Sequence, residues 1–289
     1  MAFNSIVCVK QVPDTANITS EAMTPEGTVN RGALPAIFNP EDLHALETAL
    51  EIRDRWGGTV TVVSMGPPKA AEVLRECLYR GADRAILLTD RRAAASDTLA
   101  TSYILSQAAK TIGNFDFIFC GRQAIDGDTA QTGPQIAEKL EIPQVTYLEE
   151  IVDATRGADG KAVAKIRRNT GNGWEVVETR LPAMVTVLDT ANDPRPMAAK
   201  KVLRYKKAAV PAEVPAERAE ALKAAGLLLE QWTLDDIHAD LNRCGLAGSP
   251  TKVFRIESIV LTKEGFKEVP ATEAGMQDLV HELISDRTL

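Results

Sequence analysis

The sequence of 289 residues has few cysteines and histidines, and no pattern that would group them as metal ligands. Cys8, Cys77, Cys120 and Cys244 form no CxxC pair, and the three histidines lie on separate predicted helices. Zinc and iron–sulfur sites need closely spaced ligands, so the sequence predicts free thiols and no metal centre. It also has no GxSxG nucleophile motif and no evident acid–base pair. We therefore expect a protein that holds a cofactor, with no catalytic residues of its own.

Long apolar runs and an excess of positive charge are also missing. No apolar stretch reaches the roughly 18 residues that a membrane span needs, and the first strand-like segment starts too early for a secretory signal. We therefore expect a cytoplasmic protein without membrane insertion. The formal net charge is -7, which argues against a nucleic-acid partner because phosphate binding needs an excess of Lys and Arg. The local exception is a basic stretch at residues 200–207.

Strand-like and helix-like segments alternate through the first part of the chain. Short apolar runs predict strands at residues 6–9, 59–64, 85–88 and 115–120, and the first two of these runs are rich in β-branched residues. Apolar periodicity predicts a helix that starts at about residue 40 and further helices at 70–79, 97–109 and 132–140. Runs that are apolar on both faces and separated by helices predict a parallel sheet with helices on both faces. Asn39 is expected to cap its helix, with Pro40 at the first helical position.

A strand expected at 144–147 is the last of this alternating part, and the pattern changes from Glu149. Antiparallel signals follow at 162–168, 174–181 and 183–188, with a Gly171-Asn172-Gly173 turn that predicts a hairpin. Past Asn192 the alternation stops. There the sequence predicts a linker or exposed helix at 206–225, a helix at 232–240, a strand at 252–259 and a last helix at 272–284. We therefore predict an α/β nucleotide-binding domain in 1–192 and an extended arm in 193–289 that packs on a partner.

The most informative segment runs from Cys120 to Gln135. It follows an apolar strand and opens a helix, so its backbone amides can point at a phosphate or diphosphate from a helix N-terminus. It is neither GxGxxG nor GxxxxGK[ST], so no standard dinucleotide motif or P-loop is predicted. The alternative is a strand-to-helix turn whose polar residues only cap the helix.

In the binding interpretation each residue of this segment has a role. Gly121 permits close backbone approach, Arg122 supplies positive charge, and Thr132 offers a hydroxyl to phosphate. Asp128 and Thr129 cap the helix or bond a ribose.

Two other predicted strands end at the same edge of the sheet, where ligands of such folds bind. Lys10 is either an exposed loop lysine or a phosphate contact, and Met65 is either a core residue or a cofactor contact.

These segments together resemble the beta subunits of electron-transfer flavoproteins. The resemblance rests on residues 9–14 (VKQVPD), 39–40 (NP), 66–68 (GPP), 80–85 (RGADRA) and 121–126 (GRQAID). It implies an adenine-nucleotide-hydrolase-like fold and an alpha subunit that carries FAD. It also implies electron transfer from NADH or an acyl-CoA dehydrogenase to a quinone oxidoreductase, ferredoxin or flavodoxin. A stand-alone ATP-binding stress protein of the same fold is the alternative from another class.

In this family the beta subunit's own pocket holds AMP in the housekeeping type and a second FAD, reduced by NADH, in the bifurcating type. Residues 126–134 and 245–253 resemble the bifurcating type. Gly127 and Ala130 stand where the AMP type usually has an acidic residue and an Asn. The resemblance thus implies FAD, with AMP as the alternative.

The resemblance also assigns residues. The nucleotide is expected against Cys8, Asn39, Met65, Gly66, Gly121, Arg122, Gln123, Ile125, Gly127, Asp128, Thr129, Ala130, Gln131, Thr132 and Gly133. A partner-recognition loop is expected at Asn192, Pro194, Arg195 and Ala199, and the C-terminal arm is expected to pack on the alpha subunit. Ala199 replaces a leucine that many members have, and residues 206–225 form a longer segment than expected, so the dehydrogenase partner stays open.

Overall fold

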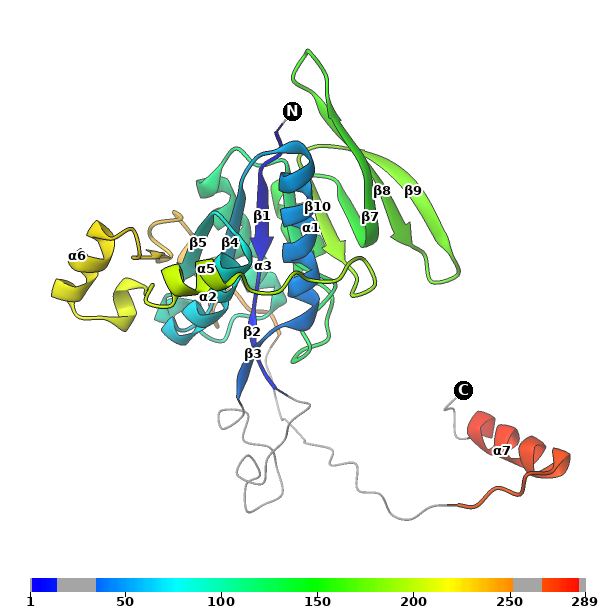
Figure 1. Cartoon of the computed structure of the whole chain (residues 1–289). Coiled ribbons are helices and arrows are strands. Elements are labelled where there is room, and N and C mark those ends of the chain that lie inside the picture. Colours follow the sequence, from blue (N-terminus) through cyan, green and yellow to red (C-terminus); the bar gives the residue numbers. More distant parts are fainter. Residues whose placement is uncertain (1, 15–34, 252–266, 286–289) are drawn as a thin grey trace, which may run out of the picture.

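The computed structural model describes residues 2–14, 35–251 and 267–285. Its centre is a nine-stranded sheet with the strand order β11-β5-β4-β1-β6-β10-β7-β8-β9 (Figure 1). In chain order its strands are β1 (Ser5–Cys8), β4 (Val60–Met65), β5 (Arg84–Leu88), β6 (Phe117–Gly121), β7 (Gln144–Arg156), β8 (Ala162–Asn169), β9 (Trp174–Arg180), β10 (Ala183–Val187) and β11 (Glu230–Trp232). A separate antiparallel pair is formed by β2 (Gln11–Pro13) and β3 (Ala36–Phe38).

Helices cover both faces of the parallel part, as predicted. On one face α1 (Pro40–Trp56) and α2 (Ala71–Arg80) share a core with Phe117 and Phe119 of β6. On the other face α3 (Thr98–Ile112) and α4 (Thr132–Leu140) pack with Ile118 of the same strand. Alternate residues of β6 thus point to opposite faces, and both faces are buried. Truncating a fully buried Phe such as Phe119 is expected to cost about 3–5 kcal/mol.

The order of the strands creates a switch point between β1 and β6. From β1 the chain passes to β4 and β5 on one side, and then returns to place β6 on the other side of β1. The connections on the two sides of β1 therefore diverge, which opens a crevice at the carboxyl ends of β1 and β6.

The antiparallel region is partly as predicted. Strands β8 and β9 form the expected hairpin, with Gly171 and Gly173 at positive φ angles of 86° and 152° in the turn. The expected antiparallel strand at 183–188 is wrong in direction, because β10 lies parallel to and between β6 and β7. All five of its residues are buried, which fits an interior parallel strand.

The segment after Asn192 departs most from expectation. The helix predicted at 232–240 is wrong: β11 ends at Trp232 after pairing in parallel with β5, and turns follow. Asp236 accepts hydrogen bonds from the backbone and hydroxyl of Thr233, which begins a helical turn, but His238 at a positive φ of 51° ends that turn before a helix forms. The strand–helix alternation therefore does not stop at 192, and Leu234, Ile237 and Cys244 pack beside Leu88 of β5.

The remaining helices agree better with the sequence. The 206–225 segment includes the largely exposed α6 (Ala216–Ala224), and α5 (Ala199–Tyr205) precedes it. The last helix is α7 (Glu273–Ser285), close to its predicted bounds, whereas the strand predicted at 252–259 lies outside the described residues. Among the helices of the described part, none has both the length and the apolarity to span a membrane.

Candidate functional site

A cavity of about 470 Å³ lies at the carboxyl edge of the sheet, at the switch point between β1 and β6. Its wall comes from the ends of β1, β4 and β6, from the loop before α3 and the start of α3, and from the loop between β6 and α4. This size and this place are typical of small-ligand and cofactor sites in α/β proteins.

The structure brings most of the predicted nucleotide residues together around this cavity. Those that line it are Cys8, Met65, Gly121, Arg122, Gln123, Gly127, Asp128, Thr129, Ala130, Gln131, Thr132 and Gly133. Asn39, Gly66 and Ile125 are not part of its lining. Met65 fits both interpretations, because it packs against the core and also lines the cavity.

The N-terminus of α4 is the part of the wall best suited to an anion. Its N-cap residue, Gln131, makes no side-chain capping hydrogen bond, and Gln131, Thr132 and Gly133 all line the cavity. The N-terminus of α3 differs, because Asp97 caps it by accepting a hydrogen bond from Ala100 N. First-turn N–H groups without a side-chain cap attract anions, so α4 offers the phosphate-binding point.

The glycines of this segment have different physical roles. A Cβ at Gly121 would lie 2.6 Å from the backbone carbon of Glu41, so the close approach at this position is made by α1 and involves no ligand. A Cβ at Gly133 would lie 2.8 Å from Cys120 Sγ, because α4 packs tightly on the sheet. A Cβ at Gly127 would meet nothing within 4 Å, because this cavity-lining residue is exposed.

Asn39 does not cap its helix as predicted. It makes no capping hydrogen bond; its Nδ2 donates to Gln123 O at 2.9 Å and its Oδ1 accepts from Ile125 N at 3.2 Å. The fully buried side chain thus hydrogen-bonds to backbone groups of the loop after β6 and not to the N–H groups of its own helix. Pro40 does occupy the first helical position.

Sequence reasoning missed the two acidic residues that follow. Glu41 accepts hydrogen bonds from Gln123 N and from the Arg122 guanidinium, both at 2.8 Å. Asp42 accepts from Lys10 N at 2.9 Å and from Gly121 N at 3.0 Å. Acidic residues are ordinary in the first turn of a helix, so nothing in the local sequence marks these two as loop anchors.

Two cations lie at the cavity, and both are paired. Lys10 Nζ is 2.7 Å from Asp126, and Arg122 is 2.8 Å from Glu41. Burial, and then the charge of Asp42, raise the pKa of the Cys8 thiol to about 12, and burial raises the pKa of Cys120 well above its usual range. Both thiols are therefore protonated at neutral pH and unsuited to nucleophilic chemistry.

The wall from Ala93 to Leu105 was also missed. It includes Ala95 at a positive φ of 60°, and the opposite wall has Asp128 and Ala130 at 48° and 52°. Non-glycine residues rarely adopt this conformation, and they cluster at ligand sites.

This second wall is held in place by hydrogen bonds to residues 245–251. Asp97 N donates to Ser249 Oγ at 2.8 Å, Thr251 N donates to the Asp97 carboxylate at 3.1 Å, and Gly245 N donates to Ser96 Oγ at 3.1 Å. These contacts join residues about 150 positions apart, so no local pattern could show them.

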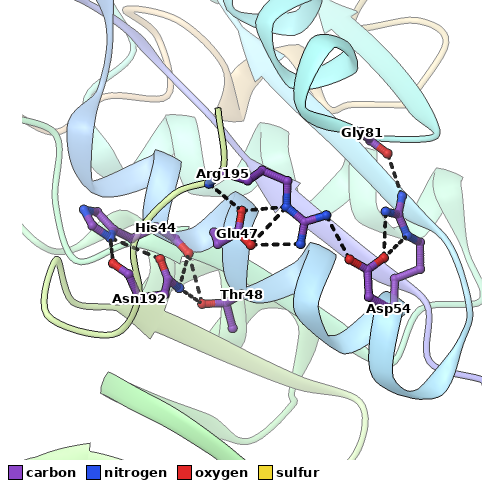
Figure 2. Close-up of polar contacts among 8 residues, drawn as sticks. His44, Glu47, Thr48, Asp54, Gly81, Asn192 and Arg195 are labelled. Atoms are coloured by element: carbon purple, nitrogen blue, oxygen red, sulfur yellow. Dashed lines mark hydrogen bonds and ion pairs between the residues drawn. The ribbon is translucent and has the colours of Figure 1, made fainter. Parts of the chain in front are cut away.

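Of the residues predicted to recognise a partner, Asn192 and Arg195 contact α1 (Figure 2), and none of the four lines the cavity. Asn192 Nδ2 donates to Thr48 Oγ1 at 2.9 Å, and its backbone carbonyl lies 2.9 Å from the His44 ring. Arg195 pairs with the buried Glu47 and with Asp54, both at 2.8 Å. These side chains hold the segment onto α1, whereas Ala199 is exposed at the start of α5. A partner contact at Asn192, Pro194, Arg195 and Ala199 stays a prediction.

The sheet, its switch-point cavity and the uncapped helix that opens on it define an α/β protein with a cofactor-sized site at the carboxyl edge. The electron transfer flavoprotein domain family matches residues 26–217. The chain is 45% identical over 250 residues to the electron transfer flavoprotein subunit beta of Clostridium acetobutylicum, covering 86% of each. It is 42% identical over 285 residues to protein FixA of Sinorhizobium fredii, covering 97% of this chain and 92% of FixA. It is 42% identical over 251 residues to the caffeyl-CoA reductase-Etf complex subunit CarD of Acetobacterium woodii, covering 86% of each.

The chain therefore belongs to the electron transfer flavoprotein family, among its beta subunits and FixA proteins. The family resemblance predicted from five short segments is confirmed, and with it a role in flavin-based electron transfer.

Proposed function

We propose that this chain works as the beta subunit of a heterodimeric electron carrier and that its switch-point cavity binds FAD. The observation that carries the proposal is the cavity at the β1–β6 edge with the uncapped N-terminus of α4 in its wall. The partner is a larger alpha subunit with its own FAD, on which the C-terminal arm packs. Relatives named as a beta subunit and as a subunit of an Etf complex support a multi-subunit assembly.

The lining residues fit an adenine dinucleotide. Thr132 and Gly133, in the uncapped first turn of α4, line the cavity and offer backbone amides to the diphosphate, and Arg122 and Lys10 supply positive charge in the same cavity. Arg122 Nε is buried and has no hydrogen-bond partner among the described residues, so it is an unused donor. Cys8, Met65, Leu105 and Cys120 add an apolar surface suited to a flat ring. A bound flavin supplies the electron chemistry, and the chain's residues bind and orient it.

Space beside the loop favours FAD over AMP. Gly127 lines the cavity and has no atom within 4 Å of a would-be Cβ, and Ala130 is small. A second nucleotide half needs this room, whereas AMP does not. We further propose, from the resemblance, NADH as a transient electron donor, an acyl-CoA dehydrogenase or a related dehydrogenase as a redox partner, and a quinone oxidoreductase, ferredoxin or flavodoxin as acceptor. We also propose that the complex works in the cytoplasm.

The test is the cofactor content of the complex purified with its large subunit. We expect two FAD molecules per heterodimer after denaturation and chromatography. The double variant Gly127→Glu with Ala130→Asn should lose one FAD and keep the other, because only this chain's cavity is filled. One FAD plus one AMP in the unmodified complex would rule out FAD in this cavity. A homodimer that binds ATP and has no large partner would instead support the stand-alone alternative.

A further inference from the structure

Asp42 joins the two strand ends that flank the switch point. Its carboxylate accepts a hydrogen bond from Lys10 N, just after β1, and one from Gly121 N, at the end of β6. The residue is only 6% exposed and lines the cavity. One side chain thus ties together the two strand ends just beyond their last paired residues, at the base of the cavity.

The neighbouring residues extend this anchoring along the loop after β6. Glu41 holds Gln123 N, and Asn39 holds Gln123 O and Ile125 N. The first turn of α1 is therefore a frame for residues 121–125, which lead into the proposed diphosphate cradle. Two members of this frame also reach the β1 side: Asn39 N donates to Lys10 O at 3.0 Å, and Asp42 accepts from Lys10 N with its side chain.

The charge on Asp42 has no cation of its own. Among the described residues no ion pair to its carboxylate is formed; the nearby Lys10 ammonium pairs with Asp126 and the Arg122 guanidinium pairs with Glu41. Burial raises the pKa of Asp42 to about 7, and the charge of Glu41 adds to this, against the lowering effect of the hydrogen bonds from Gly121, Asn39 and Lys10. The titratable and charged groups around it are Glu41 on α1, Cys8 and Lys10 at the end of β1, Cys77 on α2, and Cys120 and Arg122 at the end of β6.

We propose that Asp42 is a positioning residue of the nucleotide site: its carboxylate holds the ends of β1 and β6 in the binding arrangement, and its protonation releases them and weakens nucleotide binding. A protonated carboxyl cannot accept from both N–H groups with the strength of a carboxylate, because hydrogen bonds to a charged acceptor are about twice as strong as neutral ones. The proposal rests on the proposed function, in that it takes the cavity as a nucleotide site.

The test is the pH dependence of FAD binding to the heterodimer from which this chain's nucleotide has been removed. FAD is the suitable probe because none of its groups titrates between pH 6 and 8. Asp42 is ionised in about nine-tenths of the molecules at pH 8 and in about one-tenth at pH 6, so the dissociation constant for FAD should rise about tenfold from pH 8 to pH 6. Asp42→Asn mimics the protonated form, so at pH 8 it should bind FAD at least about tenfold more weakly than the unmodified complex, and its dissociation constant should not change between pH 8 and pH 6.

The matched control is Asp116→Asn, at the opposite edge of the same sheet. Asp116 accepts a hydrogen bond from Asn4 N at 2.9 Å and pairs with Arg156, so it anchors the other ends of β1 and β6 without touching the cavity. This variant should keep the full pH dependence. Amide hydrogen exchange of the unmodified complex gives a second readout: Lys10 and Gly121 amides should lose protection below pH 7.

The outcomes separate the two claims. If FAD binds equally at pH 6 and pH 8, or if Asp42→Asn keeps the pH dependence, the role of Asp42 is refuted and the FAD site stands. If the complex binds no FAD at any pH, the proposed function fails and this inference fails with it.

Discussion

Gly121 ends β6 and Gly127 lies in the loop that follows, and the structure predicts different effects for the same substitution at the two positions. An added Cβ at Gly121 would lie 2.6 Å from the carbonyl carbon of Glu41 and 2.8 Å from Asp42 N. Both are backbone atoms of α1 and cannot rotate away. An added Cβ at Gly127 would meet nothing within 4 Å. Neither glycine has a positive φ, so the clash alone separates them.

The expected magnitudes follow from these distances. Overpacking costs about 1–3 kcal/mol, and Gly121→Ala belongs at the upper end because α1 must move. Gly127→Ala should be neutral or should stabilise by up to about 1 kcal/mol, since alanine restricts the unfolded chain. For a domain of this size roughly 2–4 °C of melting temperature corresponds to 1 kcal/mol. We therefore expect Gly121→Ala to melt about 5–10 °C lower and Gly127→Ala to melt within a few degrees of the unmodified protein.

Urea unfolding followed by circular dichroism measures both variants side by side. Gly121→Ala should lower the midpoint without changing the slope, since the surface exposed on unfolding is the same. Equal losses in the two variants, or a neutral Gly121→Ala, would refute the reasoning that α1 occupies the space beside β6.

Three further predictions follow from the other anchored side chains. Arg195→Ala should lower the free energy of unfolding by about 3–4 kcal/mol because it leaves the buried Glu47 without its cation. Asp54→Asn changes the exposed partner of Arg195 and should lower it by less than about 1 kcal/mol, so equal losses of stability in urea unfolding would contradict the prediction. The pKa of Asp42 is raised to about 7, so between about pH 4 and pH 7 the folded protein binds this proton more tightly than the unfolded chain does. The contribution of Asp42 to the free energy of unfolding therefore falls as the pH rises through this window, by about 4 kcal/mol in all. Asp42→Asn should lack this slope, and parallel pH profiles of the two proteins would refute it. Ser249→Ala removes the acceptor of Asp97 N and should cost about 1 kcal/mol, with faster amide exchange at residues 95–98 and no change at the 171–173 turn.

Several elements could be predicted from the sequence because their signals are local. The helix at Thr132–Leu140 has its predicted bounds, Asp97 caps α3 as expected, and the glycine turn at 171–173 joins β8 to β9. Caps, turn residues and apolar periodicity act within a few positions of the chain, so one sequence is enough to show them.

The direction of β10 and the identity of β11 could not be predicted in this way. Both segments are short, and whether a short apolar run becomes a parallel strand depends on which strands lie beside it. A helix is expected at 232–240, but Leu234 and Ile237 pack beside Leu88 of β5 as parts of a turn.

The candidate site divides in the same way. The parallel α/β class, the family resemblance and the segment from Gly121 to Gly133 could be predicted from the amino-acid sequence, because that segment is contiguous and follows a recognisable strand. The folded chain was needed to show that Glu41 and Asp42 anchor this segment, that residues 93–105 form the opposite wall, and that Ser249 holds that wall in place. Their partners lie about 80 to 150 positions away, and such contacts arise from the order in which the strands join the sheet.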